Sequence, residues 1–156
     1  MKIKLQSLIV LFFTMLLCTT AFSQRKIKPQ PLPLVKYNSN VNAPLTAKEL
    51  AQIKEVYGAE AEKEVLNRPQ RVKDIKNILR NRVVVKQMPG AELKPYPLLS
   101  EVTLFDAYVP TLKRDTDFNP KDFNPLKYNF NFYSIGAYMY RVDHTNYYII
   151  IKSQHQ

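Results

Sequence analysis

Residues 137–152 have the sequence AYMYRVDHTNYYIIIK, and this stretch decides the fold class. Aromatic and β-branched residues fill 137–142 and 147–152, whereas residues 143–146 between them, DHTN, are typical of a turn. We therefore expect an antiparallel hairpin in which Val142 pairs with Tyr147. Strand alternation then places one set of side chains on a single apolar face: Tyr138, Tyr140, Val142, Tyr147, Ile149 and Ile151. The opposite face has mixed polarity.

The segment before the hairpin predicts further strands and turns. The β-branched run Val83–Val85 and the stretch 101–109 each favour a short strand, and aromatic residues alternate with asparagine over 128–132. Between them the motif Asp-Phe-Asn-Pro occurs at 117–120 and again at 122–125. Asx residues before proline favour turns, so we expect two successive turns with each phenylalanine pointing inward.

Helical signals precede all of these strands. Thr46 and Glu49 have the spacing of a capping box, and Gly58 is expected to end the helix that they start. A second helix should begin near Asn67 and Pro69. Its expected apolar stripe consists of Val72, Ile75, Ile78 and Leu79. Because helices precede strands, we expect an α+β fold with two or three N-terminal helices packed on a small C-terminal antiparallel sheet.

The N-terminus has the pattern of a secretory signal peptide over residues 1–23. Lys2 and Lys4 precede an apolar run over 8–17, and small residues at Ala21 and Ser23 favour cleavage before residue 24. The only cysteine, Cys18, follows a bulky leucine rather than the small residue that a bacterial lipoprotein requires, so we expect no lipid anchor there. We predict export to the periplasm or the exterior, an extended Pro-rich lead-in over 24–45, and a single α+β domain over 46–156.

The charge of the chain limits the partners that we expect. The formal net charge is +10, and it falls to +8 without Lys2 and Lys4. Positive residues concentrate in the lead-in and in the second helix. For an exported protein, such a surface fits a partner protein, an anionic envelope component or peripheral membrane contact, whereas nucleic acid lies in another compartment.

Two sets of residues are candidates for binding. Lys73, Lys76 and Arg80 lie along one flank of the second helix and could contact an anion or an acidic partner, although such a row is also typical of a solvated helix face. Tyr133 and Tyr148 belong to the aromatic cluster 128–148 and could serve as a ligand platform. Strand aromatics are more often core residues.

No pattern indicates catalysis, a metal or a cofactor. Asp115, Asp117 and Asn119 match the start of a calcium loop, but Pro120 occupies the position that requires glycine. Nothing distinguishes Glu101, Asp106 and Asp143 from other acids as a hydrolytic carboxylate pair, and neither histidine lies near a cysteine. We therefore favour a non-enzymatic exported binding or accessory protein, with a small carboxylate-dependent hydrolase or an aromatic carbohydrate-binding module as alternatives.

Overall fold

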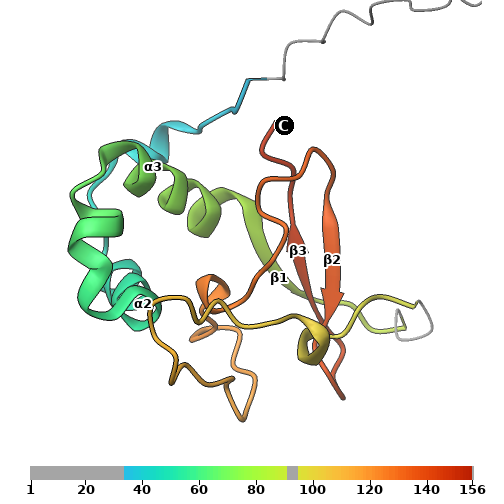
Figure 1. Ribbon diagram of the computed structural model, residues 1–156. Coiled ribbons are helices and arrows are strands. Elements are labelled where there is room, and N and C mark those ends of the chain that lie inside the picture. The colour runs from blue at the N-terminus through green and yellow to red at the C-terminus, as the bar shows by residue number, and fades with distance from the viewer. Residues whose placement is uncertain (1–33, 91–94, 156) are drawn as a thin grey trace, which may run out of the picture. The chain divides into compact units, whose positions relative to one another are not determined.

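The computed structural model describes residues 34–90 and 95–155, which contain two α-helices and a three-stranded antiparallel sheet joined by short 3-10 and π-helical turns and loops (Figure 1). This architecture confirms the expected α+β class. The expected signal peptide over 1–23 and residues 24–33 of the lead-in lie outside the described residues. Within the described ranges, no helix is both long enough and apolar enough to cross a membrane.

The capping box at Thr46 forms as expected and starts helix α2, Ala47–Tyr57. The Glu49 amide donates to the Thr46 hydroxyl at 3.2 Å, and the Thr46 amide donates to the Glu49 carboxylate at 2.8 Å. Gly58 ends the helix with a φ of 52°, a conformation that disfavours residues with a Cβ. A 3-10 turn over Gly58–Glu60 and a π-helical turn over Glu62–Leu66 follow.

Helix α3, Pro69–Asn77, starts with proline at its first position and continues into a π-helical turn over Ile78–Arg82. The residue that precedes the first helical position is Arg68, one later than the expected Asn67. Ile75 and Ile78 of the expected stripe are fully buried, while Val72 and Leu79 are half-buried at its margin. The amphipathic pattern therefore correctly identified the side of α3 that faces the core.

The sheet has the strand order β1-β3-β2, with β1 Val83–Gln87, β2 Tyr138–Arg141 and β3 Tyr147–Ile151. The predicted hairpin register is confirmed, because Tyr140 lies opposite Ile149 and the Val142 amide donates to the Tyr147 carbonyl at 2.9 Å. Strand β1 pairs with the other side of β3 and places Val85 opposite Ile149.

Two expected strands do not form. Residues 101–109 make one isolated bridge, Leu104 with Tyr128, instead of a ladder. The next pair in that register would need the Lys127 amide to donate to the Phe105 carbonyl, but this amide donates to the Asn124 carbonyl at 3.3 Å, where the chain forms a 3-10 turn over Pro125–Lys127. Over 128–132 the backbone makes tight turns, because the Phe130 amide donates to the Tyr128 carbonyl and the Phe132 amide to the Phe130 carbonyl, both at 2.8 Å.

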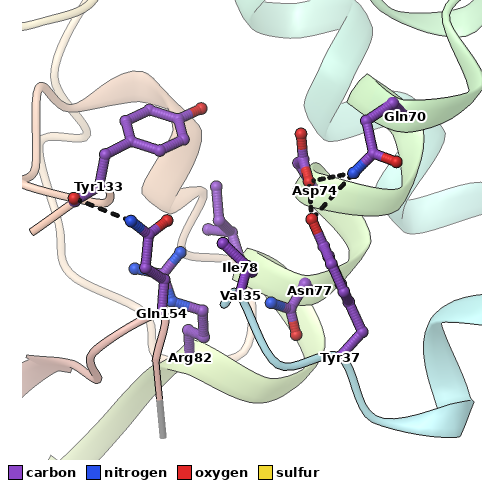
Figure 2. Close-up of a pocket in the computed structure, with 9 residues that line it drawn as sticks. All are labelled: Val35, Tyr37, Gln70, Asp74, Asn77, Ile78, Arg82, Tyr133 and Gln154. Carbon is purple, nitrogen blue, oxygen red and sulfur yellow. Dashed lines mark hydrogen bonds between the residues drawn. The ribbon is translucent and has the colours of Figure 1, made fainter. Parts of the chain in front are cut away.

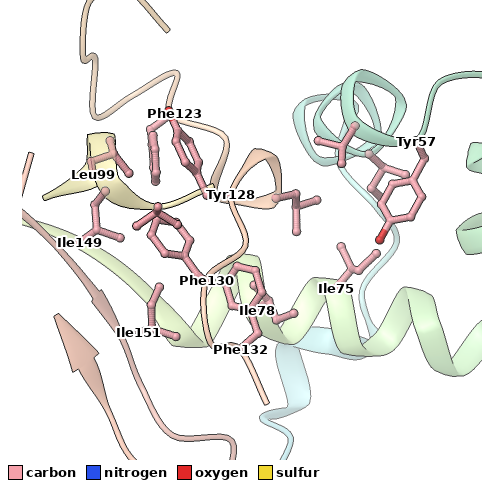
Figure 3. Close-up of a cluster of buried hydrophobic side chains, with 14 of the residues drawn as sticks. Tyr57, Ile75, Ile78, Leu99, Phe123, Tyr128, Phe130, Phe132, Ile149 and Ile151 are labelled. Carbon is pink, nitrogen blue, oxygen red and sulfur yellow. The ribbon is translucent and has the colours of Figure 1, made fainter. Parts of the chain in front are cut away.

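The core lies between the helices and the inner face of the sheet (Figure 3). The alternation over 128–132 still directs its aromatic rings inward. Phe130 stacks on Tyr128 at 5.4 Å and packs at a tilt against Tyr140 at 4.8 Å between ring centroids. In the repeated motif, Phe123 is buried and Phe118 is half-buried against it at 5.3 Å. Ring burial was therefore predictable even where the strand was not.

The outer face of the sheet is covered at Tyr148. This side chain is 0% exposed, and the ring of Tyr96 meets it edge-on at 5.7 Å between centroids. The neighbouring segment also pairs with β2, since the Arg141 amide donates to the Pro97 carbonyl at 2.9 Å. Segment 95–98 thus contacts the edge of β2 at Arg141 and covers part of the outer face.

Residues 34–45 belong to the same compact unit as the rest of the described chain, so the folded unit begins before the expected residue 46. The Lys36 amide donates to the Gln154 carbonyl at 3.2 Å, and a 3-10 turn over Ser39–Asn42 buries Val41. The side chains of Asn40 and Asn81 exchange two hydrogen bonds, at 2.7 and 3.0 Å. These contacts attach this part of the lead-in to α3 and to the C-terminal residues.

Candidate functional site

An apolar cavity of about 260 Å³ opens beside α3, and we call it the Tyr133 pocket. Apolar and aromatic side chains from four separate segments make up most of its wall. The lining residues are Tyr57, Arg71, Ile75, Ile78, Phe105, Leu126, Tyr128, Asn129, Phe130, Phe132 and Tyr133. A mostly apolar cavity with a few convergent polar groups is the usual form of a small-molecule site.

Arg71 provides the charge of the Tyr133 pocket. Its guanidinium donates to the Tyr133 hydroxyl at 2.6 Å and to the Tyr57 hydroxyl at 3.0 Å. Among the described residues, no carboxylate lies within ion-pair distance of this half-buried arginine. Burial raises the pKa of Tyr57, so its hydroxyl remains neutral at physiological pH. The pocket therefore contains a permanent cation whose side-chain partners among the described residues are two tyrosine hydroxyls.

A second, more polar hollow of about 210 Å³ shares Tyr133 and Ile78 with this pocket (Figure 2). Tyr37 donates to the Asp74 carboxylate, and the Gln70 amide donates to both groups at 2.9 Å. Burial and the Asp74 carboxylate together raise the pKa of Tyr37 to about 12. The polar groups of Tyr37, Gln70 and Asp74 thus bond to one another, whereas the guanidinium in the Tyr133 pocket bonds to tyrosine hydroxyls.

The structure places the predicted cations Lys73, Lys76 and Arg80 beneath residues 37–44. Lys73 lies over the ring of Tyr37 at 4.6 Å, and buried Lys76 donates to the Ala43 carbonyl at 2.9 Å. Arg80 donates to three backbone carbonyls of the segment and forms an ion pair with Glu49 at 2.6 Å. An external anion would have to displace these intramolecular partners.

The two predicted aromatic contacts have opposite environments. Tyr133 is 55% exposed at the mouth of the pocket, whereas Tyr148 is fully buried beneath Tyr96. A carbohydrate platform would require a row of exposed tyrosines on one sheet face. Of the described strand tyrosines, Tyr138 is exposed at 41%, and Tyr140 and Tyr147 are half-buried. Tyr133 is thus the aromatic residue of this pair that a ligand can reach.

The acidic residues weighed for metal binding and hydrolysis lie in separate local contacts. Lys127 donates to Asp115 at 2.5 Å, and the Asn119 side chain accepts the Lys121 amide at 3.0 Å, which is turn chemistry. Asp143 accepts the Ser100 amide at 3.0 Å and also its hydroxyl, and these bonds lower its pKa against the effect of burial. Across the described ranges, no group of three or more His, Cys, Asp or Glu could hold a metal ion.

Sequence reasoning missed Arg71, although a signal for it exists. Arg71, Ile75, Ile78 and Arg82 follow one another at helical spacing, so an arginine stands at each end of the buried stripe. A cation in line with buried isoleucines indicates a charged group at the margin of the core. The tyrosines that meet it come from positions 57 and 133. Nothing local in the sequence connects these positions.

Comparison with known proteins gives no relative: no family model matches the chain, and neither curated proteins nor solved structures provide a significant match.

Proposed function

We propose that this chain is an exported, non-enzymatic binding protein whose Tyr133 pocket takes an aromatic or acyl group that carries an anionic head. The observation that carries the proposal is the half-buried guanidinium of Arg71 at an aromatic cavity, bonded to two tyrosine hydroxyls and to no carboxylate among the described residues. The signal-like pattern over 1–23 and the net positive charge support export and an anionic envelope partner.

The chemistry of the pocket supports a ligand with two unlike ends. Ile75, Phe130 and Phe132 offer an apolar wall that gains from excluding water, at about 25 cal/mol for each Å² buried. Arg71 offers planar N–H donors that suit a carboxylate or phosphate oxygen. Tyr133 is largely exposed and can rotate away from Arg71 to admit such a head group.

A pair of isosteric probes tests this proposal. Phenylacetate and its neutral analogue phenylacetamide have the same ring and nearly the same size. The apolar wall of the cavity should therefore contribute equally to the binding free energy of both. Calorimetric titration should show tighter binding of phenylacetate by about 10- to 100-fold, the usual contribution of a charge-assisted hydrogen bond. Equal affinities, or no binding of either probe, would refute the proposal.

Two arginines of the same helical region provide a matched comparison. Arg71→Met should remove the preference for the carboxylate while leaving weak binding of the ring. Arg68→Met is the control, because Arg68 is 55% exposed and pairs with Glu64 at 3.0 Å away from the pocket. If Arg68→Met weakens phenylacetate as much as Arg71→Met does, the preference comes from overall charge rather than from the pocket.

A further inference from the structure

The outer edge of strand β1 offers unpaired backbone groups. The Met88 amide donates to the Asn146 carbonyl and the Lys152 amide to the Arg82 carbonyl, so the even-numbered residues of β1 bond to β3. In an antiparallel ladder the alternate residues then direct their amides and carbonyls away from the partner. These residues are Val83, Val85 and Gln87, and the amide of Val83 already bonds to Ile78. Within the described chain, no hydrogen bond is recorded for the backbone groups of Val85 and Gln87 that point outward.

A groove of about 490 Å³ runs beside this edge, and we call it the β1 groove. Val83 and Val85 form its wall on the sheet side, and α2 and residues 120–125 form the other side. The full lining is Thr46, Lys48, Glu49, Gln52, Leu79, Val83, Val85, Pro120, Lys121, Phe123 and Pro125. None of these residues lines the Tyr133 pocket, so the groove is a separate surface.

The side chains of a strand added at this edge would have a defined place. Val83 and Val85 share the sheet face of Ile149 and Ile151, which is the face on which the groove lies. Every second side chain of an added strand would therefore enter the groove beside Leu79 and Phe123. The side chains between them would lie on the outer face, next to exposed Lys86.

We propose that the β1 groove binds an extended acidic peptide of a partner protein, which adds a strand to the edge of β1. Peptides that add a strand draw affinity from main-chain bonds and specificity from alternate side chains. The charge of the site favours an acidic peptide: Lys48 and Lys121 line the groove, Lys86 flanks it, and Glu49 is neutralised by Arg80. A second copy of this basic chain would bring Lys86 against Lys86, and the lead-in before residue 34 is itself basic.

A labelled heptapeptide, acetyl-Thr-Val-Glu-Val-Glu-Val-Thr-amide, tests the proposal by fluorescence anisotropy with protein purified after expression of the full chain. Two isomers each carry two N-methyl groups, either on the first two Val residues or on both Glu residues, and they distinguish backbone pairing from nonspecific binding. One isomer alone should lose at least tenfold in affinity: the Val isomer if pairing is antiparallel, the Glu isomer if it is parallel. Equal binding of both isomers, or no binding of the parent peptide, would overturn the proposal.

Variants of β1 locate the binding on the protein. Val85→Pro removes an outward amide that makes no bond to β3, and proline is tolerated at such an edge position. It should abolish binding of the parent peptide. Lys86→Glu should weaken binding at least tenfold, whereas Lys54→Glu, an exposed change of equal charge on α2, should reduce it far less.

Other results of these experiments would overturn the peptide proposal. Unchanged binding by Val85→Pro, or equal losses in Lys86→Glu and Lys54→Glu, would place the peptide elsewhere and overturn the proposal. Sedimentation of the protein alone gives an independent test: a dimer that Val85→Pro dissociates would make a second copy the occupant. If Val85→Pro does not fold, the methylated isomers and Lys86→Glu still test the edge.

Discussion

Replacing Glu49 by glutamine removes the charge at the contact that joins α2, the π-helical turn after α3 and the segment 37–44. Arg80 donates to both carboxylate oxygens of Glu49, with Nε–Oε1 and Nη2–Oε2 distances of 2.6 Å. The side chain of Arg80 is 15% exposed and that of Glu49 is 9% exposed. The same carboxylate caps α2 through the Thr46 amide. Glutamine retains the size and one acceptor but leaves the guanidinium without its counter-charge.

The magnitude follows from the pKa of Glu49. The hydrogen bond from Arg80 lowers this pKa, and the Thr46 amide adds to the effect while burial opposes it, so that the pKa falls from 4.5 to about 2. A depression of that size corresponds to about 3 kcal/mol of stability from the ionised group. Breaking a buried ion pair by removing one partner costs a similar amount. We expect Glu49→Gln to lose about 3 kcal/mol of unfolding free energy at pH 6.

The stabilising effect of Glu49 should decrease as the pH falls. Because the folded pKa is depressed, the contribution is fully present above the unfolded pKa of 4.5 and is lost as pH falls toward 2. Urea unfolding from pH 6 to pH 2 should therefore show the two proteins converging at the acidic end. Exposed Glu62→Gln is the control. A loss below about 0.5 kcal/mol at pH 6, or a gap that stays constant with pH, would refute the reasoning.

Three further results follow from the structure. Ile149→Ala removes a fully buried side chain and should cost about 2–5 kcal/mol in urea unfolding, whereas half-buried Ile150→Ala should cost clearly less; the reverse order would contradict the register. The Lys36 amide, bonded to the Gln154 carbonyl, should exchange with deuterium far more slowly than that of exposed Leu34; equal rates would mean that the segment is detached. Intact-mass analysis of protein from its own host should give an N-terminus at Gln24, and an acylated Cys18 would exclude that processing.

Local signals in the sequence were sufficient for the elements that depend on neighbouring residues. The capping box needs only Thr46 and Glu49, and the hairpin register follows from alternation on both sides of a four-residue turn. His144 in that turn adopts a φ of 53°, as turn residues with positive φ do. Each of these features is set within a few residues of chain.

The failures involve partners distant in the chain. Residues 101–109 have strand composition, but their ladder ends at Lys127, whose amide donates to the Asn124 carbonyl instead of the Phe105 carbonyl. Lys76 and Arg80 resemble a free cationic face until the carbonyls of 40–44 fold over them. Helical spacing alone does not show what covers a face.

The candidate site was predictable only in part. Tyr133 was identified from aromatic content, whereas Tyr148 was assigned to the ligand although Tyr96 covers it. Arg71 can be recognised as a site residue only in the structure, where α3 places it between Tyr57 and Tyr133, which lie 76 residues apart in the sequence. Because the residues of this site come from three separate segments, no local pattern in the sequence identifies it.

A crystal structure of the protein soaked with phenylacetate would show directly whether Arg71 binds a carboxylate in the Tyr133 pocket. The ring should lie between Ile75 and Phe130 and the carboxylate on the guanidinium of Arg71, with the Tyr133 hydroxyl displaced from its present 2.6 Å contact. Phenylacetate bound at Lys73 or another surface lysine, with the Arg71–Tyr133 contact intact and the cavity without a ligand, would contradict this prediction.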